Sequence, residues 1–479
     1  MFSLIYRFYF HLPASRIHYY LTRSITTSIY PQTVSDILKT KPIGSSVSLI
    51  GSLENVRKLK TQYFLDFIDG SSLNHLQVIV SGKNLPDVGK LNFGSTIRVN
   101  GTIVRSTHPQ QEIELQAKQI DIIGSCDAFN YPLKCKTKHS FHFLRSCEQF
   151  RARDRMYGGA LLSIRSELFY LIHNYFHEHK FTHIQTPCIT SSDCEGGGET
   201  FKIKEYYSQS TSQMKEYFDK QTYLTVSGQL HLEAAASGLS RVYTLNPVFR
   251  ADKNLSRFHL AEFWMLEAEI AGITKLEQLL DIYKHILQTV TANLRQNCRE
   301  QFRLLEEYDI KPEFIDQFFL DKYSIVTYDE AVGYLKKSDE FQDFPKNGDF
   351  TRAHENYLCQ KIMNNQPFFL INYPKEVKPF YMLVNDDECT VANFDFIFPS
   401  VGELSGGSLR EHRYERLHKT VELLKLDDEL DWYLDLRRYG SMPTAGFGLG
   451  IERFLIALTG IDNVRDVIPF PRYYQHCMS

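Results

Sequence analysis

The sequence lacks the features that mark several classes of protein. None of its nine cysteines forms a Cys-x-x-Cys pair, which argues against a zinc ribbon or a disulfide framework and favours reduced thiols in an intracellular compartment. No apolar run approaches the roughly 18 residues that a membrane span requires, so we expect no membrane partner. The formal net charge is only −3, and any contact with nucleic acid must therefore come from local basic patches.

Asp and Glu are absent from residues 1–35, where Arg7, Arg16 and Arg23 recur among aromatic, Ser and Thr residues. This composition is typical of a mitochondrial targeting segment. A secretory signal is the alternative, but Arg7 interrupts its apolar run and the cysteine pattern argues against secretion. We therefore expect residues 1–35 to direct the protein to the mitochondrial matrix.

The chain also lacks a P-loop. Its most glycine-rich loop, Glu195-Gly196-Gly197-Gly198-Glu199, has neither the lysine nor the spacing that a triphosphate-binding loop needs. Three glycines between two glutamates predict instead a mobile flap that brings carboxylates to a small cationic group.

Residues 36–125 are expected to form a small barrel. Five short β-rich runs follow one another between residues 44 and 123, separated by turn signals, although any small β-domain would fit the same pattern. Barrels of this kind often bind nucleic acid. Phe64, with Arg57 nearby, offers a stacking ring and a phosphate partner, and a solvated basic loop is the alternative.

At 479 residues the chain is long enough for two or three domains. A basic, irregular stretch at residues 126–154 is interpreted as a hinge between the barrel and a larger domain at residues 155–479. The larger domain opens with an amphipathic helix from Leu161 to Phe176, whose apolar residues recur at three- and four-residue spacing. A second helical stretch begins at Leu276. Near residues 300–348 the acidic and aromatic sequence indicates a helical insertion without a metal or nucleophile pattern.

The central stretch of the larger domain, Val242 to Ile270, predicts a long antiparallel hairpin. Arg250 closes its first strand. The second strand carries alternating residues that must share one face of the sheet, namely Phe263, Met265, Glu267 and Glu269. Buried charges need partners, and phosphate, purine or ammonium groups would each find one here. A solvated sheet face is the alternative.

Two further segments towards the C-terminus carry candidate ligands. Asp395 and Glu403 lie on or beside successive predicted strands and could hold a hard divalent cation against phosphate oxygens, or could instead cap neighbouring backbone. The run GFGLGIERF predicts a glycine-rich strand that turns into a helix carrying Arg453. Its glycines permit close approach of a flat ligand on which Arg453 could stack, with close packing as the alternative.

Three of these segments together resemble class II aminoacyl-tRNA synthetases. FR-loop-HLAEF, GELSGGSLRE and GLGIERF are similar to motif 2, the segment before motif 3, and motif 3, and Pro187 in FTHIQTPCI fits motif 1. With the N-terminal barrel, the arrangement resembles subclass IIb from about residue 40 to the end. The resemblance implies an α+β protein: a five-stranded OB-fold barrel and a catalytic domain with an antiparallel sheet flanked by helices.

Finer motifs resemble the asparaginyl-tRNA synthetases, most closely the mitochondrial type. They are CEGGGE, VSGQLHLE, RxHLAEF and YPKEVKPFYM. Aspartate enzymes carry a lysine shortly after the Ser-x-Gln turn, where this chain has none and adds Glu233. Glu233 would accept hydrogen bonds from an amide and Arg410 would donate to its oxygen, so the pair would recognise a carboxamide. One departure is Phe258, where related enzymes often have a second arginine. Arg257 alone would then serve the loop.

The resemblance implies the substrates ATP, L-asparagine and tRNA(Asn), the cofactor Mg²⁺ and a homodimer. Arg250 and Arg453 would be catalytic, with Arg250 on the α-phosphate. ATP would be bound by Arg250, His259, Phe263, Glu403 and Arg453, with the metal on Asp395 and Glu403. Asparagine would be bound by Glu195, Ser227, Gln229, Glu233 and Arg410. The tRNA anticodon would be bound by Arg57, Phe64 and Gln77.

Three alternatives remain at this stage: an aspartate-charging or non-discriminating enzyme, a synthetase-like protein that binds tRNA without catalysis, and an asparagine synthetase built on the same catalytic fold. The anticodon-type barrel argues against the last of these.

Overall fold

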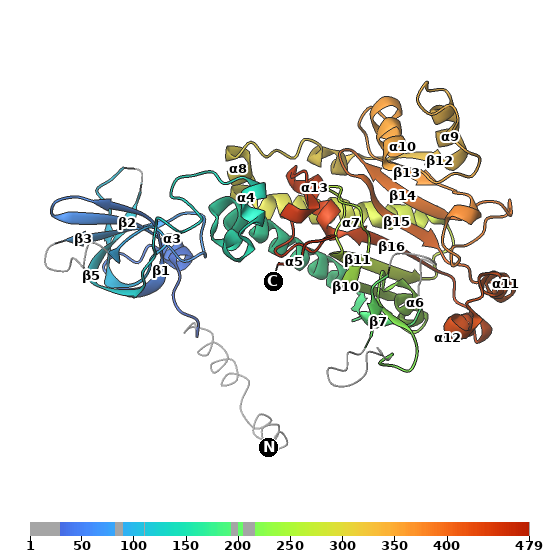
Figure 1. Ribbon diagram of the computed structural model, residues 1–479, viewed down its shortest axis with the longest axis horizontal. Helices are drawn as coiled ribbons and strands as arrows, with labels where there is room; N and C mark the ends of the chain where they lie inside the picture. Colours follow the sequence, from blue (N-terminus) through green and yellow to red (C-terminus); the bar gives the residue numbers. More distant parts are fainter. Residues whose placement is uncertain (1–28, 82–89, 110, 193–199, 205–215, 479) are drawn as a thin grey trace, which may run out of the picture. The chain divides into compact units, whose positions relative to one another are not determined.

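The computed structural model describes residues 29–81, 90–109, 111–192, 200–204 and 216–478 (Figure 1). The chain divides into two compact units. The barrel unit comprises residues up to Ser140 together with Arg153–Arg155, and the sheet unit comprises Phe141–Ala152 and Met156–Ser479. Most of the expected targeting segment, residues 1–28, lies outside the described residues. The rest of it leads into helix α3 (Val34–Thr40), which Thr33 and Asp36 cap reciprocally.

The barrel unit contains the predicted five-stranded barrel, closed in the order β1-β2-β3-β5-β4. Its strands are β1 (Ser46–Lys58), β2 (Gln62–Ile68), β3 (Leu76–Ser81), β4 (Thr96–Arg105) and β5 (Ile113–Gly124). Alternate side chains fill the interior, as the twofold period of a strand requires. Closure is tight at Gly51 and Gly101, where an added Cβ would lie 2.3 Å from a carbonyl oxygen of the neighbouring strand.

The sheet unit is built on an eight-stranded sheet in the order β12-β13-β14-β15-β16-β11-β10-β6, and a small second sheet has the order β7-β9-β8. The strands of the large sheet are β6 (Thr182–His183), β10 (Arg241–Phe249), β11 (Glu262–Ala271), β12 (Ser324–Thr327), β13 (Phe368–Ile371), β14 (Asn393–Phe398), β15 (Gly402–Leu409) and β16 (Thr444–Gly450). Those of the small sheet are β7 (Ile189–Thr190), β8 (Lys202–Ile203) and β9 (Thr222–Leu224). The pairing of β10 with β11 is antiparallel and unbroken, which confirms the predicted hairpin.

Helices flank this sheet (Figure 1). They are α4 (Phe141–Arg145), α5 (Ser163–Glu178), α6 (Gln229–Leu239), α7 (Leu276–Asn297), α8 (Arg299–Glu307), α9 (Tyr328–Lys336), α10 (Arg352–Tyr357), α11 (Tyr414–Leu424), α12 (Asp427–Arg438) and α13 (Ile451–Thr459). Helix α5 buries the apolar side chains that the sequence assigned to its inner face. The α+β architecture expected from the resemblance is therefore present.

Helix α7 covers one face of the sheet and leaves the other for the cavity described below. Tyr283 of α7 lies among the rings of Phe394, Phe396 and Phe447 and meets Ser405 through its hydroxyl. Because strand side chains alternate, Asp395 between the two phenylalanines of β14 points to the opposite face. Packing on the aromatic face thus fixes the direction of a candidate ligand on the other.

The segment FTHIQTPCI forms the separate short strands β6 and β7, because Pro187 lacks the N–H that a continuous ladder would need. One predicted segment differs from the structure. The stretch near residues 300–348, expected as a helical insertion, contains α8 and α9. It also supplies β12, which pairs in parallel with β13 and extends the main sheet by one strand.

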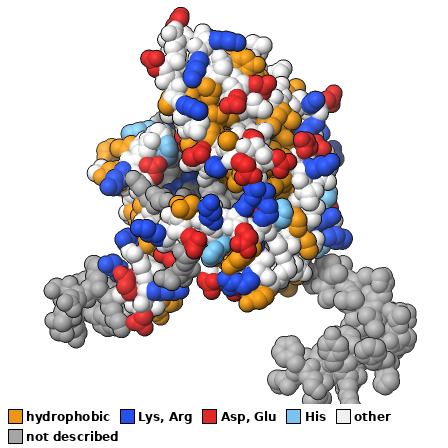
Figure 2. All heavy atoms as spheres, turned by 90° about the vertical axis from the view of Figure 1, so that its right-hand side faces the viewer, with side chains coloured by type: hydrophobic (Ala, Val, Ile, Leu, Met, Phe, Trp, Pro, Cys, Tyr) orange, Lys and Arg blue, Asp and Glu red, His pale blue; other side chains and the backbone are white. Residues whose placement is uncertain are grey.

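Figure 2 shows one face of the molecule, on which basic and acidic side chains are interspersed with apolar ones. This mixture agrees with the small net charge of −3. Among the described residues, no helix combines the length and apolar character that crossing a bilayer demands.

Candidate active site

A cavity of about 350 Å³ opens on the sheet face opposite α7. It brings together most of the predicted catalytic and substrate-binding residues, which come from the β10–β11 hairpin, from β14 and β15, from the start of α6 and from α13. Those that line it are Ser227, Gln229, Arg250, His259, Phe263, Asp395, Glu403, Arg410 and Arg453. Two predicted residues are not among them. Glu195 lies outside the described residues, and Glu233 lies behind the cavity wall.

The hairpin forms one wall of the cavity as its alternation predicted. Phe263, Met265, Glu267 and Glu269 all line it, because residues two apart on β11 point to the same face. The guanidinium of Arg250 lies 5.6 Å from the centre of the Phe263 ring, across the hairpin. A flat ring and a permanent cation therefore sit side by side, a combination that suits a nucleotide's base and phosphate.

Glu267 anchors the turn that precedes α6. It accepts hydrogen bonds from the Ser227 hydroxyl and from the Gly228 N–H, the latter at 2.8 Å, and the Ser227 oxygen in turn accepts from the Gln229 N–H at 3.1 Å. The side-chain Nε2 of Gln229 is buried, and no described atom pairs with it. Leaving a buried polar atom unpaired is costly, so this amide is available to a ligand in the cavity.

Glu269 and Arg410 form a buried ion pair in the cavity wall. Nε and Nη2 of Arg410 lie 3.1 Å and 2.8 Å from the two carboxylate oxygens, while Nη1 donates to the Ser408 hydroxyl at 2.7 Å. Burial raises the pKa of Glu269 despite the opposing effect of Arg410, and the carboxylate raises the pKa of Arg410. A Cβ on Gly446 would fall 1.9 Å from Glu269 Oε2, so only glycine leaves room for the pair.

The structure does not bring Glu233 together with Arg410 as the sequence suggested. Glu233, 3% exposed, is held by Arg437 and by the Tyr433 hydroxyl, which lies 2.5 Å from Oε2. Its negative charge nevertheless acts on the wall, since it raises the pKa values of both Glu269 and Arg410. The residue that faces Arg410 directly is Glu269, which the sequence placed on the hairpin face without a specific partner.

Asp395 and Glu403 converge as predicted. Their oxygens Oδ1 and Oε1 lie 3.2 Å and 3.5 Å from the point that a Cβ on Gly406 would occupy. A β-bulge makes this possible, because Phe396 pairs with Ser405 and the next residue pairs with Glu403, leaving one extra residue in β15. Without the bulge Glu403, three residues before Gly406, would point to the other face of the sheet.

This pair of carboxylates fits a hard divalent cation that also takes phosphate oxygens. The other Asp395 oxygen, Oδ2, accepts a hydrogen bond from Lys378 Nζ at 2.7 Å, and Lys378 lies 3.8 Å from the centre of the Tyr373 ring. Sequence analysis missed Lys378, although it stands in the YPKEVKPFYM run. Within the described part of the chain, no group of three or more His, Cys, Asp or Glu side chains is arranged to hold a metal.

Arg453 and His259 complete the cationic side of the cavity. Arg453 lies in the first turn of α13 and donates from Nη1 to the Glu403 carbonyl oxygen at 2.8 Å. Burial lowers the pKa of His259; Asp252 opposes this, and the nearby arginines add to it. A neutral imidazole among guanidinium groups can accept or donate a single hydrogen bond to a phosphate or an adenine.

In the barrel unit, the predicted anticodon residues lie on adjoining strands. Phe64 on β2 has the Arg57 guanidinium 5.6 Å from its ring centre, and Arg57 lies 3.7 Å from Asp66. Gln77 on β3 accepts a hydrogen bond from Gln111 at 2.5 Å. A ring, a cation and an amide on one sheet surface can stack on a base and hydrogen-bond its edge.

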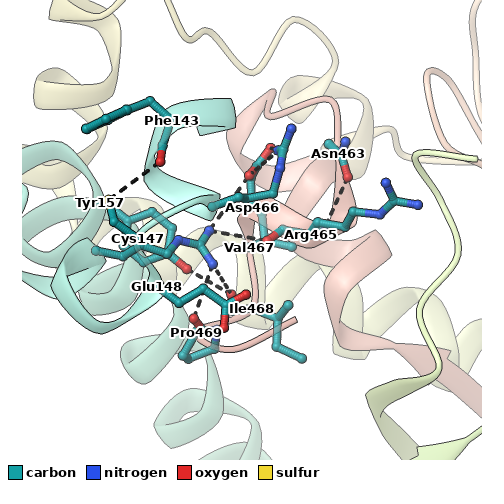
Figure 3. Close-up of polar contacts among 12 residues, drawn as sticks. Phe143, Cys147, Glu148, Tyr157, Asn463, Arg465, Asp466, Val467, Ile468 and Pro469 are labelled. Carbon is teal, nitrogen blue, oxygen red and sulfur yellow. Dashed lines mark hydrogen bonds and ion pairs between the residues drawn. The ribbon is translucent and has the colours of Figure 1, made fainter. Parts of the chain in front are cut away.

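A buried polar network of the sheet unit, absent from the sequence-based predictions, holds the C-terminal segment, which in turn supports the hairpin loop (residues 250–261). Figure 3 shows Tyr157, Glu148 and Asp466 around the carbonyl groups of residues 467–469. The Tyr157 hydroxyl donates to the Ile468 carbonyl at 2.8 Å, and Arg151 donates to the carbonyls of Ile468 and Pro469. The network holds the C-terminal segment against the start of the unit.

The same C-terminal segment holds the hairpin loop. Arg465, labelled in Figure 3, donates from Nη2 to the carbonyl oxygens of Leu255 and Ser256 at 2.9 Å and 3.3 Å. The Ala261 N–H donates to the Arg472 carbonyl at 2.7 Å. The hairpin loop is therefore held at its middle and at its C-terminal end by residues far away in the sequence.

The arrangement is suited to displacement at a phosphate. It offers a cation beside a flat ring, two carboxylates for a metal, and a separate, charge-balanced wall for a small polar substrate. Among the described cavity residues, the Ser227 hydroxyl donates to Glu267 and the Lys378 ammonium donates to Asp395, so both groups are engaged in holding their neighbours in place. The attacking group would then come from the small substrate itself.

Comparisons with known proteins agree with this reading. Residues 148–474 match the family model described as tRNA synthetases class II (D, K and N). The asparaginyl-tRNA synthetase of Mus musculus is 41% identical over 441 residues, 91% of each chain. The asparagine–tRNA ligase of Mycoplasma genitalium is 38% identical over 459 residues, 92% of this chain and 98% of the relative. A crystal structure of asparaginyl-tRNA synthetase from Pyrococcus horikoshii complexed with asparaginyl-adenylate is also similar, with a TM-score of 0.82 and 25% identity over 94% of this chain and 100% of that chain.

Proposed function

The chain belongs to the asparaginyl-tRNA synthetases, within the class II tRNA synthetases (D, K and N), and on this premise we propose how its own residues perform the reaction. The enzyme activates L-asparagine with ATP and transfers it to tRNA. In the first step an oxygen of the asparagine α-carboxylate attacks the α-phosphorus of ATP. The bond to the bridging oxygen breaks, pyrophosphate leaves, and asparaginyl-adenylate remains. In the second step the 3′-hydroxyl of tRNA(Asn) attacks the activated carbonyl and AMP leaves.

Arg250 neutralises the α-phosphate as negative charge develops on it, while Phe263 and Arg453 hold adenine between a ring and a guanidinium. Glu195 and the side-chain carbonyl oxygen of Gln229 accept hydrogen bonds from the α-ammonium group of asparagine, and Ser227 is fixed by Glu267 beside them. Holding both reactants in line supplies much of the acceleration, because no protein nucleophile is needed.

Mg²⁺, bound by Asp395 and Glu403 together with ATP oxygens, would offset the charge of the phosphates. The fit rests on the two carboxylates that converge over Gly406 and on their donor chemistry. Within the protein itself, the hydrogen bond from Lys378 Nζ holds the Asp395 side chain in place.

The observation that carries asparagine as the amino acid is that the buried charges around Arg410, in the cavity wall and behind it, form matched ion pairs. Two buried carboxylates, Glu269 and Glu233, are matched by two guanidinium groups, Arg410 and Arg437. A neutral carboxamide leaves this balance intact, whereas the carboxylate of aspartate would bring an unpaired negative charge into it. Glu269 and Ser408 occupy three of the five Arg410 N–H groups, so two remain to donate to the amide oxygen.

ATP–pyrophosphate exchange measured separately with asparagine and with aspartate tests the assignment. We expect exchange with asparagine and little with aspartate. Equal rates would establish a non-discriminating enzyme instead. Binding of tRNA without adenylate formation with either amino acid would establish a binding protein.

Two further properties belong to the proposal. Residues 1–35, with three arginines and no acidic residue, would direct the enzyme to the mitochondrial matrix. If a reporter protein fused to this segment stays in the cytosol, the assignment is contradicted.

The motif 1 resemblance around Pro187 supports a homodimer. A mass of a single chain by light scattering at working concentration would contradict it.

A further inference from the structure

The hairpin loop departs from related enzymes at Phe258, which stands where they often carry an arginine. Phe258 lines the cavity and is 8% exposed. Its neighbour Arg257 is not a good substitute for the missing cation, because its guanidinium is more than half exposed and pairs with the exposed Asp462 at 3.2 Å. The loop therefore presents a ring to the cavity where a charge would be expected.

A different arginine lies on that ring. The guanidinium of Arg352, the first residue of α10, lies 3.3 Å from the centre of the Phe258 ring, a stacked contact. The Arg352 stem passes over Gly402, where its Cγ lies 3.9 Å from the point that a Cβ would occupy. Helix α10 is far from the hairpin in the sequence, and none of the synthetase motifs contains it.

Packing on the Phe258 ring does not by itself explain why a guanidinium lies at this position. Arg352 donates to the Ser400 carbonyl at 2.9 Å, and no carboxylate of the described chain forms an ion pair with it. Burial and the nearby charges of Arg453 and Arg257 lower its pKa to about 10, although the carboxylate of Glu355 opposes this shift. A half-buried cation beside other cations is unfavourable until an anion joins them.

The anion that this reaction supplies is a polyphosphate. His259 lines the cavity beside Phe258, and the charges of Arg453, Arg352 and Arg250 all act on its imidazole. The three guanidinium groups therefore lie around this histidine. When the bond to the α-phosphate breaks, pyrophosphate carries away the negative charge, and cations beyond the α-phosphate stabilise it.

We infer that Arg352, stacked on Phe258, binds the polyphosphate of ATP and the pyrophosphate leaving group, in place of the arginine that the hairpin loop lacks. This inference rests on the proposed function and adds a residue from α10 to its nucleotide site. The ring of Phe258 orients the guanidinium plane, and the Ser400 carbonyl fixes one edge of it.

Arg352→Gln removes the charge but keeps much of the side-chain length. We expect the Kd for ATP and for pyrophosphate to rise about tenfold or more, because a hydrogen bond to a charged group is lost. Arg352→Lys should raise these two Kd values less, because it keeps the positive charge. The KM for asparagine and the single-turnover transfer from enzyme-bound adenylate to tRNA should not change, because pyrophosphate has left by then. Arg295→Gln, at an exposed arginine of α7 paired with Asp316, is the matched control.

A second variant tests the replacement itself. Adding Phe258→Arg to Arg352→Gln should recover part of the lost ATP and pyrophosphate binding, since the cation then returns on the loop. Unchanged Kd values for both ligands in Arg352→Gln would overturn the inference. Equal losses in asparagine binding and in transfer would also overturn it, since they would show a structural role. Titration of ATP and pyrophosphate needs no amino acid, so its result stands apart from the exchange assay that tests the proposed function.

Discussion

At the scale of single residues, the two buried ion pairs in and behind the cavity wall join residues that are distant in the sequence. Arg410 lies 141 positions from Glu269, and Arg437 lies 204 positions from Glu233. Both pairs are almost fully buried. Charges in such surroundings are tolerated because each is paired and hydrogen-bonded. Removing one member therefore leaves its partner buried and unpaired, which is strongly unfavourable.

Replacing Glu269 by Gln should affect both stability and substrate recognition. Arg410 would lose its counter-charge in a buried site, at a cost of about 3–5 kcal/mol in the free energy of unfolding. The kcat/KM for asparagine should fall by a much larger factor than the factor by which the KM for ATP rises. Denaturant unfolding and exchange kinetics on the same preparation separate the two effects.

Glu233→Gln is the matched comparison, because Glu233 is also buried and paired with an arginine but lies behind the wall. We expect a comparable loss of stability with a smaller loss in asparagine recognition. A loss of asparagine affinity equal to that of Glu269→Gln would return direct recognition of the amide to Glu233.

His75 gives the barrel unit a stability that depends on pH. Its ring nitrogens lie 3.7 Å from carboxylate oxygens of Glu54 and Asp66, and Glu54 raises the pKa of His75 above its usual 6.5. The protonated ring stabilises the folded state, so this contribution is complete below the unfolded pKa and is lost as the pH rises through the folded pKa.

His75→Asn should therefore lower the thermal unfolding midpoint more at about pH 5.5 than at about pH 8.5. The comparison uses the wild-type chain at each pH as its reference. The same difference at both pH values would show that the imidazole acts by packing and not by charge.

Sequence patterns identified the residues of the cavity whose roles depend on local motifs. Arg250, Phe263 and Arg453 could be placed because each stands at a fixed position in a hairpin or a strand–helix turn. Lys378 and Glu267 could not be given partners, because Asp395 and the turn before α6 approach them only in the folded chain. Glu233 was given the wrong neighbour for the same reason, since Arg437 carries no motif of its own.

At the scale of elements, the hairpin loop takes its shape from the C-terminal segment. Arg465 supplies two of the hydrogen bonds, and its guanidinium lies 3.9 Å from the centre of the Tyr473 ring. Nothing in the loop sequence specifies this support. The loop's conformation is therefore a property of two elements and not of one.

Arg465→Met should loosen the loop without unfolding the sheet. We expect faster amide hydrogen exchange in residues 252–258 and a several-fold higher KM for ATP, because the loop carries cations of the nucleotide site. Arg295→Met on α7 serves as the control. Unchanged exchange in the loop would show that its remaining hydrogen bonds are sufficient to fix it.

The elements that could be predicted are those with a strong periodic pattern. Helix α5 and the hairpin of β10 and β11 match their expected extents because long amphipathic or alternating runs specify them. Strand β12 could not be predicted as part of the main sheet. Its four residues pair in parallel with β13, and that pairing is determined by the long intervening chain and not by local sequence.

At the scale of the whole molecule, the proposed function gives the barrel unit and the sheet unit separate tasks. The barrel closes on its own core, and the described residues that line the cavity all come from the sheet unit. We expect such a division from the sequence, because the alternating short strands end before the long amphipathic helix begins. We therefore expect that a substitution in the barrel unit can impair tRNA recognition without impairing amino-acid activation, and that the reverse holds for the sheet unit.

Phe64→Ala should test that separation. Loss of a base stacked on the ring costs about 1–3 kcal/mol, so the KM for tRNA should rise about tenfold or more. ATP–pyrophosphate exchange with asparagine should be unaffected, since it does not involve tRNA. A parallel loss of exchange activity would show that Phe64 supports folding of the chain and not only tRNA binding.

The bulge between β14 and β15 bears on how such sites are recognised in other sequences. Leu404 is the extra residue between Glu403 and Ser405, and the bulge absorbs it so that Glu403 keeps the face of Asp395. A chain that had lost this residue would have a regular ladder, with the glutamate two positions before the glycine and still on that face. The common face of the two acids is thus a firmer search criterion than their separation, and a pattern of fixed length would overlook proteins that build the same pair with one residue fewer.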